Sequence, residues 1–568
     1  MGQPFFQLFC IFAPSCPYKW YMVWIWPRPL LLGRAAERQM SMKAKLFLKN
    51  TVILTVGSII LRLIGVAFGA YLSRQIGAEG MGLYQLVFSV YNFASTLATS
   101  GIYLSVTRLV AEGIGRGSYA DANDAMRKCM IYGVIVSTVA ASALYGFSVP
   151  IGTKLLDDPR TVLSLRILAC ALPFMAFSSS LRGYFFAIRN VVKSTSSQIL
   201  EQLVRMAVVS AGLTILLPKG MTWACAAIAL GSVGGEALAF LYTLVLYLRD
   251  RRKRNFTPKR QKETTRKVLS ITIPVALSSY LRSALVTIEN ILIPRGFKKY
   301  GATGQSALAQ YGMMEAMVMP ILTFPSAFLT SFSSLLVPEL AEAAAVGNRR
   351  QINRLASRVM QLTLFFSLPI TAAFIAFGED LGLAVYQSAE AGAMLRVLAP
   401  LVPMLYLDTV ADAMLKGLDE QVSSLRYSII DSAISVVLIY LLIPIYGVNG
   451  YIAVMFISTF VNAALSINCL VRVTEIPFSL GDWVIKPIIA VTASSIGVLY
   501  LVRGLTFSSH AIAVVVKAGL MLLCYFGLLL LTRAVTFREI RDFRRILHPK
   551  DQKPRTVPAP QRQASHSL

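Results

Sequence analysis

Two arginines lie inside apolar runs, where a charged side chain is costly. Arg62 falls in the run 51–72 and Arg282 in the run 268–294. At about 1.5 Å per residue, Arg62 lies roughly 16 Å along its helix, near the middle of a bilayer. A lipid-facing arginine at that depth costs at least about 2.5 kcal/mol, so we expect the guanidinium to face protein or water.

A guanidinium at this depth suits an anionic ligand. Its planar set of N–H donors matches a phosphate group bidentately and keeps its charge at cellular pH. We therefore predict that Arg62 and Arg282 line one cavity that accepts a phosphate-bearing ligand. The alternative is structural bridging, although Arg62 has no charged partner within its own helix and Arg282 has only Glu289.

Other charged residues in apolar runs extend this candidate site. Arg205 follows Glu201 by one helical turn, a spacing that also permits a structural pair within one helix. Asp431 occupies the repeat position of Arg205, which suggests that the two halves of the chain differ in chemistry. The candidate site residues are Arg62, Arg282, Arg205, Glu201, Glu289 and Asp431. The acidic residues expected to act as counter-charges are Glu236, Glu289, Glu315, Asp408, Asp412 and Asp431.

Long apolar helices must carry these residues. The chain has 568 residues, of which 55% are hydrophobic and only 15% charged. Runs of about 20 apolar residues predict an all-α membrane protein with about fourteen transmembrane helices. The expected spans are 51–72, 83–105, 131–149, 164–186, 197–217, 222–248, 268–294, 311–336, 358–378, 391–415, 427–446, 450–471, 485–502 and 511–532.

The net charge of +27 is explained by topology. Most of the excess lies in short loops between apolar spans, so nucleic acid is not an expected partner. The basic segments 249–267 and 347–358 and the tail from Arg533 fall on one side of the membrane. By the positive-inside rule, both termini of this inner- or plasma-membrane protein are expected in the cytoplasm.

Segments of the first half of the chain recur in order in the second half. The matches, at shifts of 230, 226 and 220 residues, are Leu109–Met126 with Glu339–Ala356, Ala207–Gly220 with Ala433–Gly447, and Ser58–Arg62 with Ser278–Arg282. An offset of six helices keeps both copies in the same orientation, which predicts two parallel six-helix lobes. The expected division is 1–41 as a spurious or disordered leader, 42–248 as the N-lobe, 249–267 as a basic cytoplasmic linker, 268–473 as the C-lobe, 474–533 as two further helices, and 534–568 as a basic cytoplasmic tail.

Ligand spacings for metals and motifs for ATP are missing from the sequence. The seven cysteines lie mostly within or beside apolar spans, and the three histidines are isolated. No GxxxxGK[ST] motif occurs, so the chain carries no ATP-driven motor of its own. We predict no catalytic residue, no metal site and no cofactor, with H⁺ or Na⁺ as a candidate coupling ion.

Several stretches resemble a known family. They are "FLKNTVILTVGSIILRLIG", "IGAEGMGLYQL", "LVAEG", and "SLRGYFFAIRN" followed by "SQILEQLVR". From about Lys43 to Arg533, the chain resembles the stage V sporulation protein B group of polysaccharide transporters. That group is related to the lipid II flippase MurJ within the multidrug/oligosaccharidyl-lipid/polysaccharide exporter (MATE-like) superfamily.

The resemblance implies two six-helix lobes around a V-shaped cavity, alternating access, and export of an undecaprenyl-diphosphate-linked saccharide. Arg62 in "RLIG" matches an arginine in helix 1 of the MurJ relatives. Two further arginines of those relatives have no counterpart here, around Ala67–Gly69 and in "MPILTFP" (Met319–Pro325). These departures agree with the sporulation-type branch.

Three functions are candidates. The first, which we expect, is a flippase for a lipid-linked saccharide that acts as a monomer among membrane lipids. The second is a MATE-type multidrug or cation antiporter, which the fixed positive charge of Arg62 disfavours. The third is a membrane glycosyltransferase or ligase, which would need a large extracytoplasmic loop with paired carboxylates; the sequence shows no such loop, and we expect the chain not to be an enzyme.

Overall fold

The computed structural model describes residues 34–253, 262–476, 481–501 and 510–531. These residues are almost entirely helical and contain no strand, as expected for an all-α membrane protein. Most of the expected leader (1–33), the centre of the linker (254–261) and the tail (534–568) lie outside the described residues. Residues 53–568 form one compact unit, separate from residues 1–52, and the packing below concerns the larger unit.

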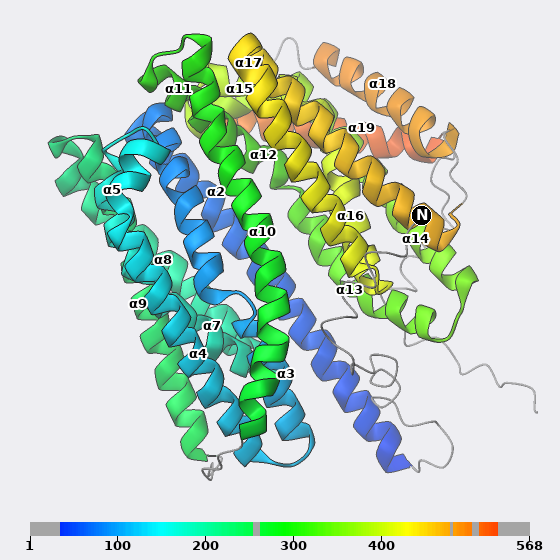
Figure 1. Ribbon diagram of the computed structural model, residues 1–568. Coiled ribbons are helices and arrows are strands. Elements are labelled where there is room, and N and C mark those ends of the chain that lie inside the picture. The colour runs from blue at the N-terminus through cyan, green and yellow to red at the C-terminus, as the bar shows by residue number, and fades with distance from the viewer. Residues whose placement is uncertain (1–33, 254–261, 477–480, 502–509, 532–568) are drawn as a thin grey trace, which may run out of the picture. The chain divides into compact units, whose positions relative to one another are not determined.

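The helices fall into two successive sets, coloured blue to teal and green to yellow in Figure 1. The first set contains α2 (Arg34–Thr99), α3 (Ile102–Gly115), α4 (Tyr119–Gly146), α5 (Ser148–Pro150), α6 (Thr161–Ala169), α7 (Ala171–Ala187), α8 (Val191–Leu216) and α9 (Met221–Lys253). The second contains α10 (Lys262–Tyr300), α11 (Gly304–Tyr311), α12 (Met319–Thr323), α13 (Ser326–Ala345), α14 (Arg349–Tyr386), α15 (Ala389–Leu398), α16 (Val402–Gly417) and α17 (Gln421–Thr474). Helices α18 (Lys486–Leu501) and α19 (His510–Leu531) follow.

Each expected span falls mainly on helix in the described residues, although breaks occur within several, and the number of fourteen spans is not confirmed. In the described part of the chain, nine helices are long and apolar enough to cross a membrane, or ten if α6 and α7, bent by 41°, form one span. Two of the nine, Ile53–Gly115 with 63 residues and Gln421–Thr474 with 54, are each longer than one crossing requires. Gly77 and Gly447 interrupt them with non-helical backbone. The count of fourteen therefore stays a prediction.

Chain reversals recur at equivalent places in the two sets. Positive φ occurs in five pairs of described residues, 224 to 230 residues apart: Gly77 and Gly301, Gly117 and Gly347, Asp157 and Gln387, Arg189 and Asp419, and Gly220 and Gly447. After the second pair, Ser118 and Asn348 cap the next helices by accepting from the N–H groups of Asp121 and Gln351 at 3.3 and 3.2 Å. This shared turn geometry agrees with an internal repeat.

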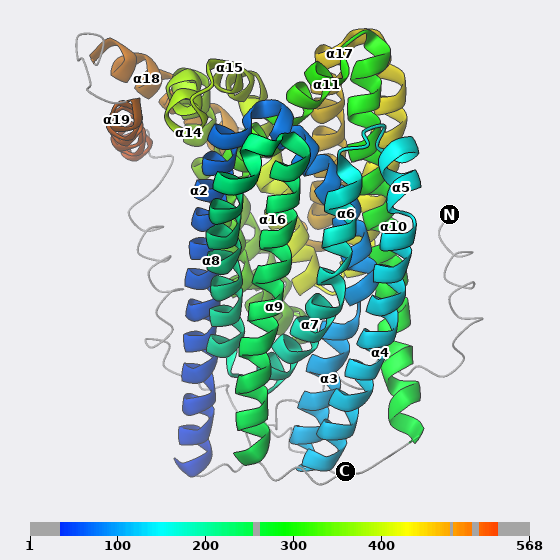
Figure 2. The ribbon, with the colours of Figure 1, turned by 90° about the vertical axis from the view of Figure 1, so that its left-hand side faces the viewer.

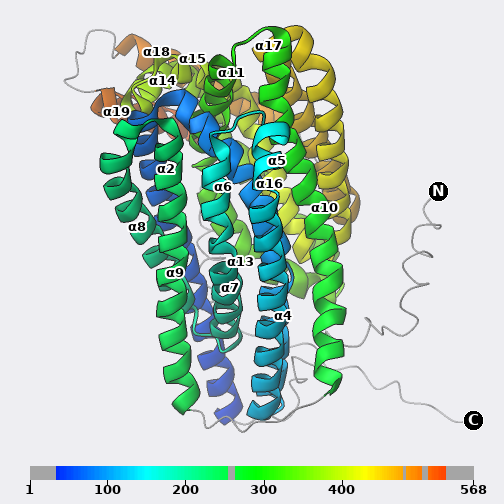
Figure 3. The same cartoon turned by 60° about the vertical axis from the view of Figure 1, so that its left-hand side comes forward.

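Helix α10 joins the two sets. It packs against α17 of its own set and against α3 and α4 of the first set, and it lies beside α4 in Figures 2 and 3. The hydroxyls of Ser105 and Thr272 are 2.7 Å apart, and Tyr280 donates to the carbonyl of Leu97 at 3.0 Å. Helices α18 and α19 pack on α14, where Phe365 contacts a small apolar cluster.

Candidate functional site

Arg62 and Arg282 both interact with residues of α16. Arg62, on α2, is half-buried and lies in the neighbourhood of the Tyr406 hydroxyl. Arg282, on α10, is exposed and interacts electrostatically with Asp408, two residues after Tyr406. Neither arginine forms an ion pair within 4.0 Å in the described part of the chain. Both guanidiniums therefore retain donors for a ligand.

The α16 residues are themselves held in place by hydrogen bonds. The Tyr406 hydroxyl donates to the carbonyl of Leu322 at 2.9 Å. Asn462 of α17 donates its Nδ2 to Asp408 Oδ2, also at 2.9 Å. These bonds fix both side chains, but residues two positions apart on a helix point to different sides of it. The contacts with α16 therefore do not by themselves bring the two arginines into one cavity, and that arrangement stays a prediction.

Four charged residues form an ion cluster in the first set of helices. This N-half ion cluster consists of Arg182 on α7, Glu201 and Arg205 on α8, and Glu236 on α9. Glu201 bridges the two arginines, with Oε1 2.8 Å from Arg205 Nη2 and Oε2 3.2 Å from Arg182 Nη1. Arg182 Nη2 lies 3.8 Å from Glu236 Oε2. The formal charges of the cluster sum to zero.

Close packing of α8 on α9 positions the N-half ion cluster. A Cβ at Gly235 would lie 2.8 Å from the carbonyl oxygen of Glu201, so only glycine permits this approach. The side chains are largely enclosed, with exposures from 3% for Glu236 to 23% for Arg205. Arg205 Nε has no hydrogen-bond partner. Burial makes mutual neutralisation important, because an unpaired buried charge is expensive.

Acidic residues gather in the second set of helices. This C-half acidic group contains Glu289 on α10, Glu315 in the π-helical segment Gly312–Val318, Asp408 on α16 and Asp431 on α17. Glu289 interacts electrostatically with Glu315 and Asp431. None of the four has an ion-pair partner within 4.0 Å among the residues with described side chains.

Hydroxyl and amide donors make the short-range contacts of the C-half acidic group, and Arg282 acts on Asp408 only at longer range. Ser458 donates to Asp431 Oδ1 at 2.7 Å, and Tyr451 donates to Glu315 Oε1. Within the described ranges, no three or more His, Cys, Asp or Glu side chains are arranged to hold a metal ion. The group can accept protons or interact with a cation through fewer carboxylates.

The six residues predicted from sequence fall into three arrangements. Arg62 and Arg282 both interact with α16, Glu201 and Arg205 pair with each other, and Glu289 interacts with Asp431. The sequence reasoning missed Arg182, which completes the N-half ion cluster. Its signal was available, because Arg182 is a charged residue inside the apolar run 164–186.

Sequence comparisons identify a family and several relatives. The family model described as "Polysaccharide biosynthesis protein" matches residues 47–344. The chain is 28% identical over 416 residues to stage V sporulation protein B of Bacillus subtilis (strain 168), covering 72% of this chain and 80% of that protein. It is 24% identical over 450 residues to the lipid II flippase MurJ of the same organism, with the same coverage of 72% and 80%.

A solved structure supports the fold. The chain is similar to an inward-facing multidrug resistance MATE family transporter of the MOP superfamily, with a TM-score of 0.56 and 15% identity over 73% of this chain and 99% of that one. At this low identity, the structural similarity supports the fold alone. Membership of the family rests on the family model, which matches more than half of the chain. The chain therefore belongs to the polysaccharide biosynthesis protein family and is an all-α membrane protein with a MATE-like fold.

Proposed function

We propose that this protein is a flippase that moves an undecaprenyl-diphosphate-linked saccharide across the membrane by alternating access. The observation that carries the proposal is that Arg62 and Arg282, from equivalent helices of the two repeats, both interact with α16 and lack ion-pair partners among the described residues. Guanidiniums without a carboxylate within 4.0 Å keep their N–H donors for a diphosphate. The similarity to stage V sporulation protein B and to a lipid II flippase supports this substrate class.

Movement of the lipid-linked saccharide needs no ATP hydrolysis in this proposal. From the positive-inside rule, we infer that the loops around Arg116 and Arg349 and both termini are cytoplasmic. An inside-negative membrane potential then favours outward movement of an anionic head group by about 2.3 kcal/mol per charge per 100 mV. The polyprenyl tail stays in lipid while the head group passes the arginines, and one monomer suffices.

Complementation tests the role of the arginines. A flippase-depleted strain receives the wild type, Arg62→Ala, Arg282→Ala, or the control Arg350→Ala, which changes an exposed arginine at a helix end. Growth is expected with the wild type and the control only. Rescue by both Arg62→Ala and Arg282→Ala would remove the arginines from the mechanism. Vesicles with defined lipid-linked sugars then identify the saccharide.

A MATE-type cation antiporter is the second candidate. The C-half acidic group favours it, because four carboxylates without an ion-pair partner among the described residues could exchange H⁺ or Na⁺ for a cationic compound. Expression in an exporter-deleted strain separates the two functions. A broad rise in resistance to cationic dyes supports the antiporter, and unchanged susceptibility supports the flippase.

A further inference from the structure

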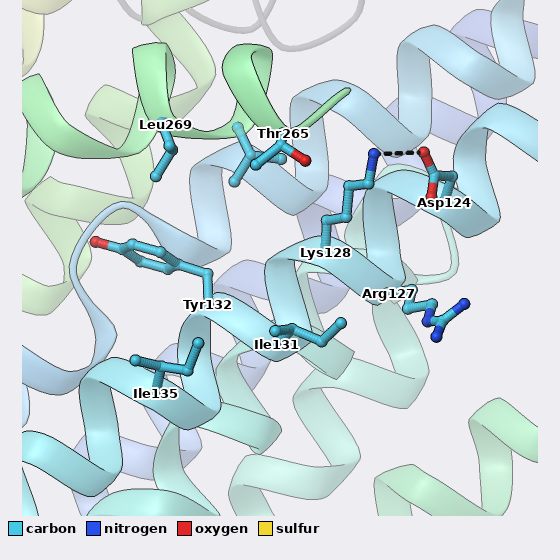
Figure 4. A pocket seen from close by; sticks show the side chains of 9 residues that line it. Asp124, Arg127, Lys128, Ile131, Tyr132, Ile135, Thr265 and Leu269 are labelled. Atoms are coloured by element: carbon cyan, nitrogen blue, oxygen red, sulfur yellow. Dashed lines mark ion pairs between the residues drawn. The ribbon is translucent and has the colours of Figure 1, made fainter. Parts of the chain in front are cut away.

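A pocket of about 390 Å³ lies between α4 and α10 and involves none of the candidate site residues. Its charged part is formed by Asp124, Arg127 and Lys128 of α4, and its apolar part includes Ile131 and Ile135 of the same helix. Figure 4 shows Thr265 and Leu269 of α10 facing these residues from the opposite wall. The pocket is therefore built from both repeats.

The charged end of the pocket is positive overall. Lys128 Nζ lies 3.0 Å from Asp124 Oδ2, so these two charges offset one another. Arg127 is exposed and has no ion-pair partner in the described part of the chain. Arg266 and Lys267, both exposed, follow Thr265 on α10 and add positive charge to this end of the helix. Such an end attracts an anionic group, and the guanidinium of Arg127 can bind a phosphate bidentately.

Two apolar ridges lead away from the charged end. On α4, Ile131, Ile135 and Val139 are spaced one turn apart and are 48%, 59% and 65% exposed. On α10, the matching series Leu269, Ile273 and Leu277 is 37%, 53% and 68% exposed. Each series covers about 12 Å of helix, and both helices run in the same direction from the charged end. The pocket includes Ile131, Ile135 and Leu269, and the exposed apolar side chains of both series go on beyond it within the predicted spans.

We propose that this pocket binds an anionic glycerophospholipid of the membrane leaflet that faces the basic loops. Arg127 binds the phosphate, and the ridges hold one acyl chain. A basic pocket between transmembrane helices on the cytoplasmic side suits an acidic head group. Charge complementarity favours an anionic over a zwitterionic lipid, and the length of the ridges favours a lipid over a soluble phosphate. Because the walls come from both repeats, the bound lipid stabilises the contact of α4 with α10.

Native mass spectrometry of the purified full-length protein tests this site. The probes are phosphatidylglycerol and phosphatidylcholine with identical acyl chains, and glycerol 3-phosphate as a head group without chains. We expect the wild type to retain phosphatidylglycerol about tenfold more strongly than phosphatidylcholine, because both lipids offer the phosphate but only phosphatidylcholine adds a choline cation, which the positive end of the pocket repels. Glycerol 3-phosphate should bind far more weakly than either lipid.

Matched variants identify the pocket. Arg127→Glu should lower retention of phosphatidylglycerol about tenfold. Arg350→Glu makes the same charge change at an exposed position elsewhere and should leave retention unchanged. Ile135→Ser should weaken retention of both phospholipids by altering the ridge. The proposal is overturned if Arg127→Glu retains phosphatidylglycerol as the wild type does, if phosphatidylcholine binds equally well, or if glycerol 3-phosphate binds as tightly as phosphatidylglycerol.

Discussion

Lys298 Nζ lies 2.7 Å from Asp157 Oδ2 and thereby links the last turn of α10 to the segment before α6. Beside this pair, Arg295 donates to the carbonyl of Lys154 at 2.5 Å. Together these contacts form an interlobe latch of Lys154, Asp157, Arg295 and Lys298. Under the proposed function, alternating access requires the two sets of helices to separate at one end while they meet at the other, so we expect this latch to break during transport.

Charge reversal should weaken the interlobe latch. Lys298→Glu places two negative charges together and should disfavour the joined arrangement by about 0.2–1 kcal/mol, because an exposed pair contributes little more. Double electron–electron resonance between spin labels at the exposed Thr153 and Gln305 should show longer distances. The swapped pair Asp157→Lys with Lys298→Glu should restore the wild-type distances. If the double variant gives the same longer distances as Lys298→Glu alone, the pair of Asp157 and Lys298 does not keep the interlobe latch closed.

The interlobe latch should not respond to pH in the physiological range. Hydrogen bonding and the positive charge of Lys298 lower the pKa of Asp157 below its ordinary value of 3.8. A lowered carboxyl pKa stabilises the folded arrangement above its unfolded pKa, and this contribution is lost as pH falls through the folded pKa. The same spin-label distances should therefore be constant from about pH 5 to 8. A change centred near pH 6 would assign the control of the latch to another group.

Gly82 and Gly312 form a second contact between the two sets of helices, where their backbones touch. A Cβ at Gly82 would lie 1.9 Å from the carbonyl oxygen of Leu308, and one at Gly312 would lie 2.3 Å from that of Ala78. Gly82→Ala should force the two repeats apart and disfavour the joined state by about 1–3 kcal/mol. Longer spin-label distances and slower transport should follow. Gly146→Ala, where nothing lies within 4 Å, should behave as wild type; equal behaviour of Gly82→Ala would contradict the steric argument.

Local patterns in the sequence predicted the helices but could not reveal such long-range contacts. Apolar runs indicate spans because each span must satisfy its own backbone in lipid. The interlobe latch joins residues 141 positions apart, and no periodicity specifies that pairing. The equivalence of Asp157 and Gln387 also escaped the sequence comparison, because two different side chains adopt the same left-handed backbone.

The candidate site, like the fold, could be predicted from the sequence only in part. A charged residue in an apolar run signals that it must face a partner, a cavity or water, and this singled out Arg62, Glu201 and Arg205. The choice among those partners depends on tertiary packing. Glu201 also binds Arg182 because α7 and α8 pack together, a relationship that helical spacing does not disclose.

Neutralising Glu201 should destabilise the protein strongly. Glu201→Gln leaves Arg182 and Arg205 facing each other with only Glu236 nearby, and breaking a buried pair costs about 3–5 kcal/mol. Thermal unfolding in one detergent should show a large loss of stability for Glu201→Gln. The double variant Glu201→Gln with Arg205→Gln should recover part of that stability. The control Glu112→Gln removes an exposed pair, with exposures of 39% for Glu112 and 61% for Arg116, and should cost at most about 1 kcal/mol. Equal losses of stability in Glu201→Gln and Glu112→Gln would show that burial of the N-half ion cluster contributes nothing to the free energy of unfolding.

Conservative replacement of Arg62 should separate charge from geometry. Under the proposed function, Arg62→Lys keeps a cation but loses the bidentate donor geometry, so transport should fall partially, whereas Arg62→Gln should lose it almost completely. A lost charged hydrogen bond corresponds to about 10- to 100-fold in apparent affinity. The measurement is flipping of defined lipid-linked sugars in vesicles. Arg166→Lys is the control, because Arg166 binds Ser148 at 3.1 Å and lies over the Tyr145 ring, outside the candidate site. If Arg62→Gln flips the lipid as fast as the wild type, the positive charge on α2 does not bind the diphosphate.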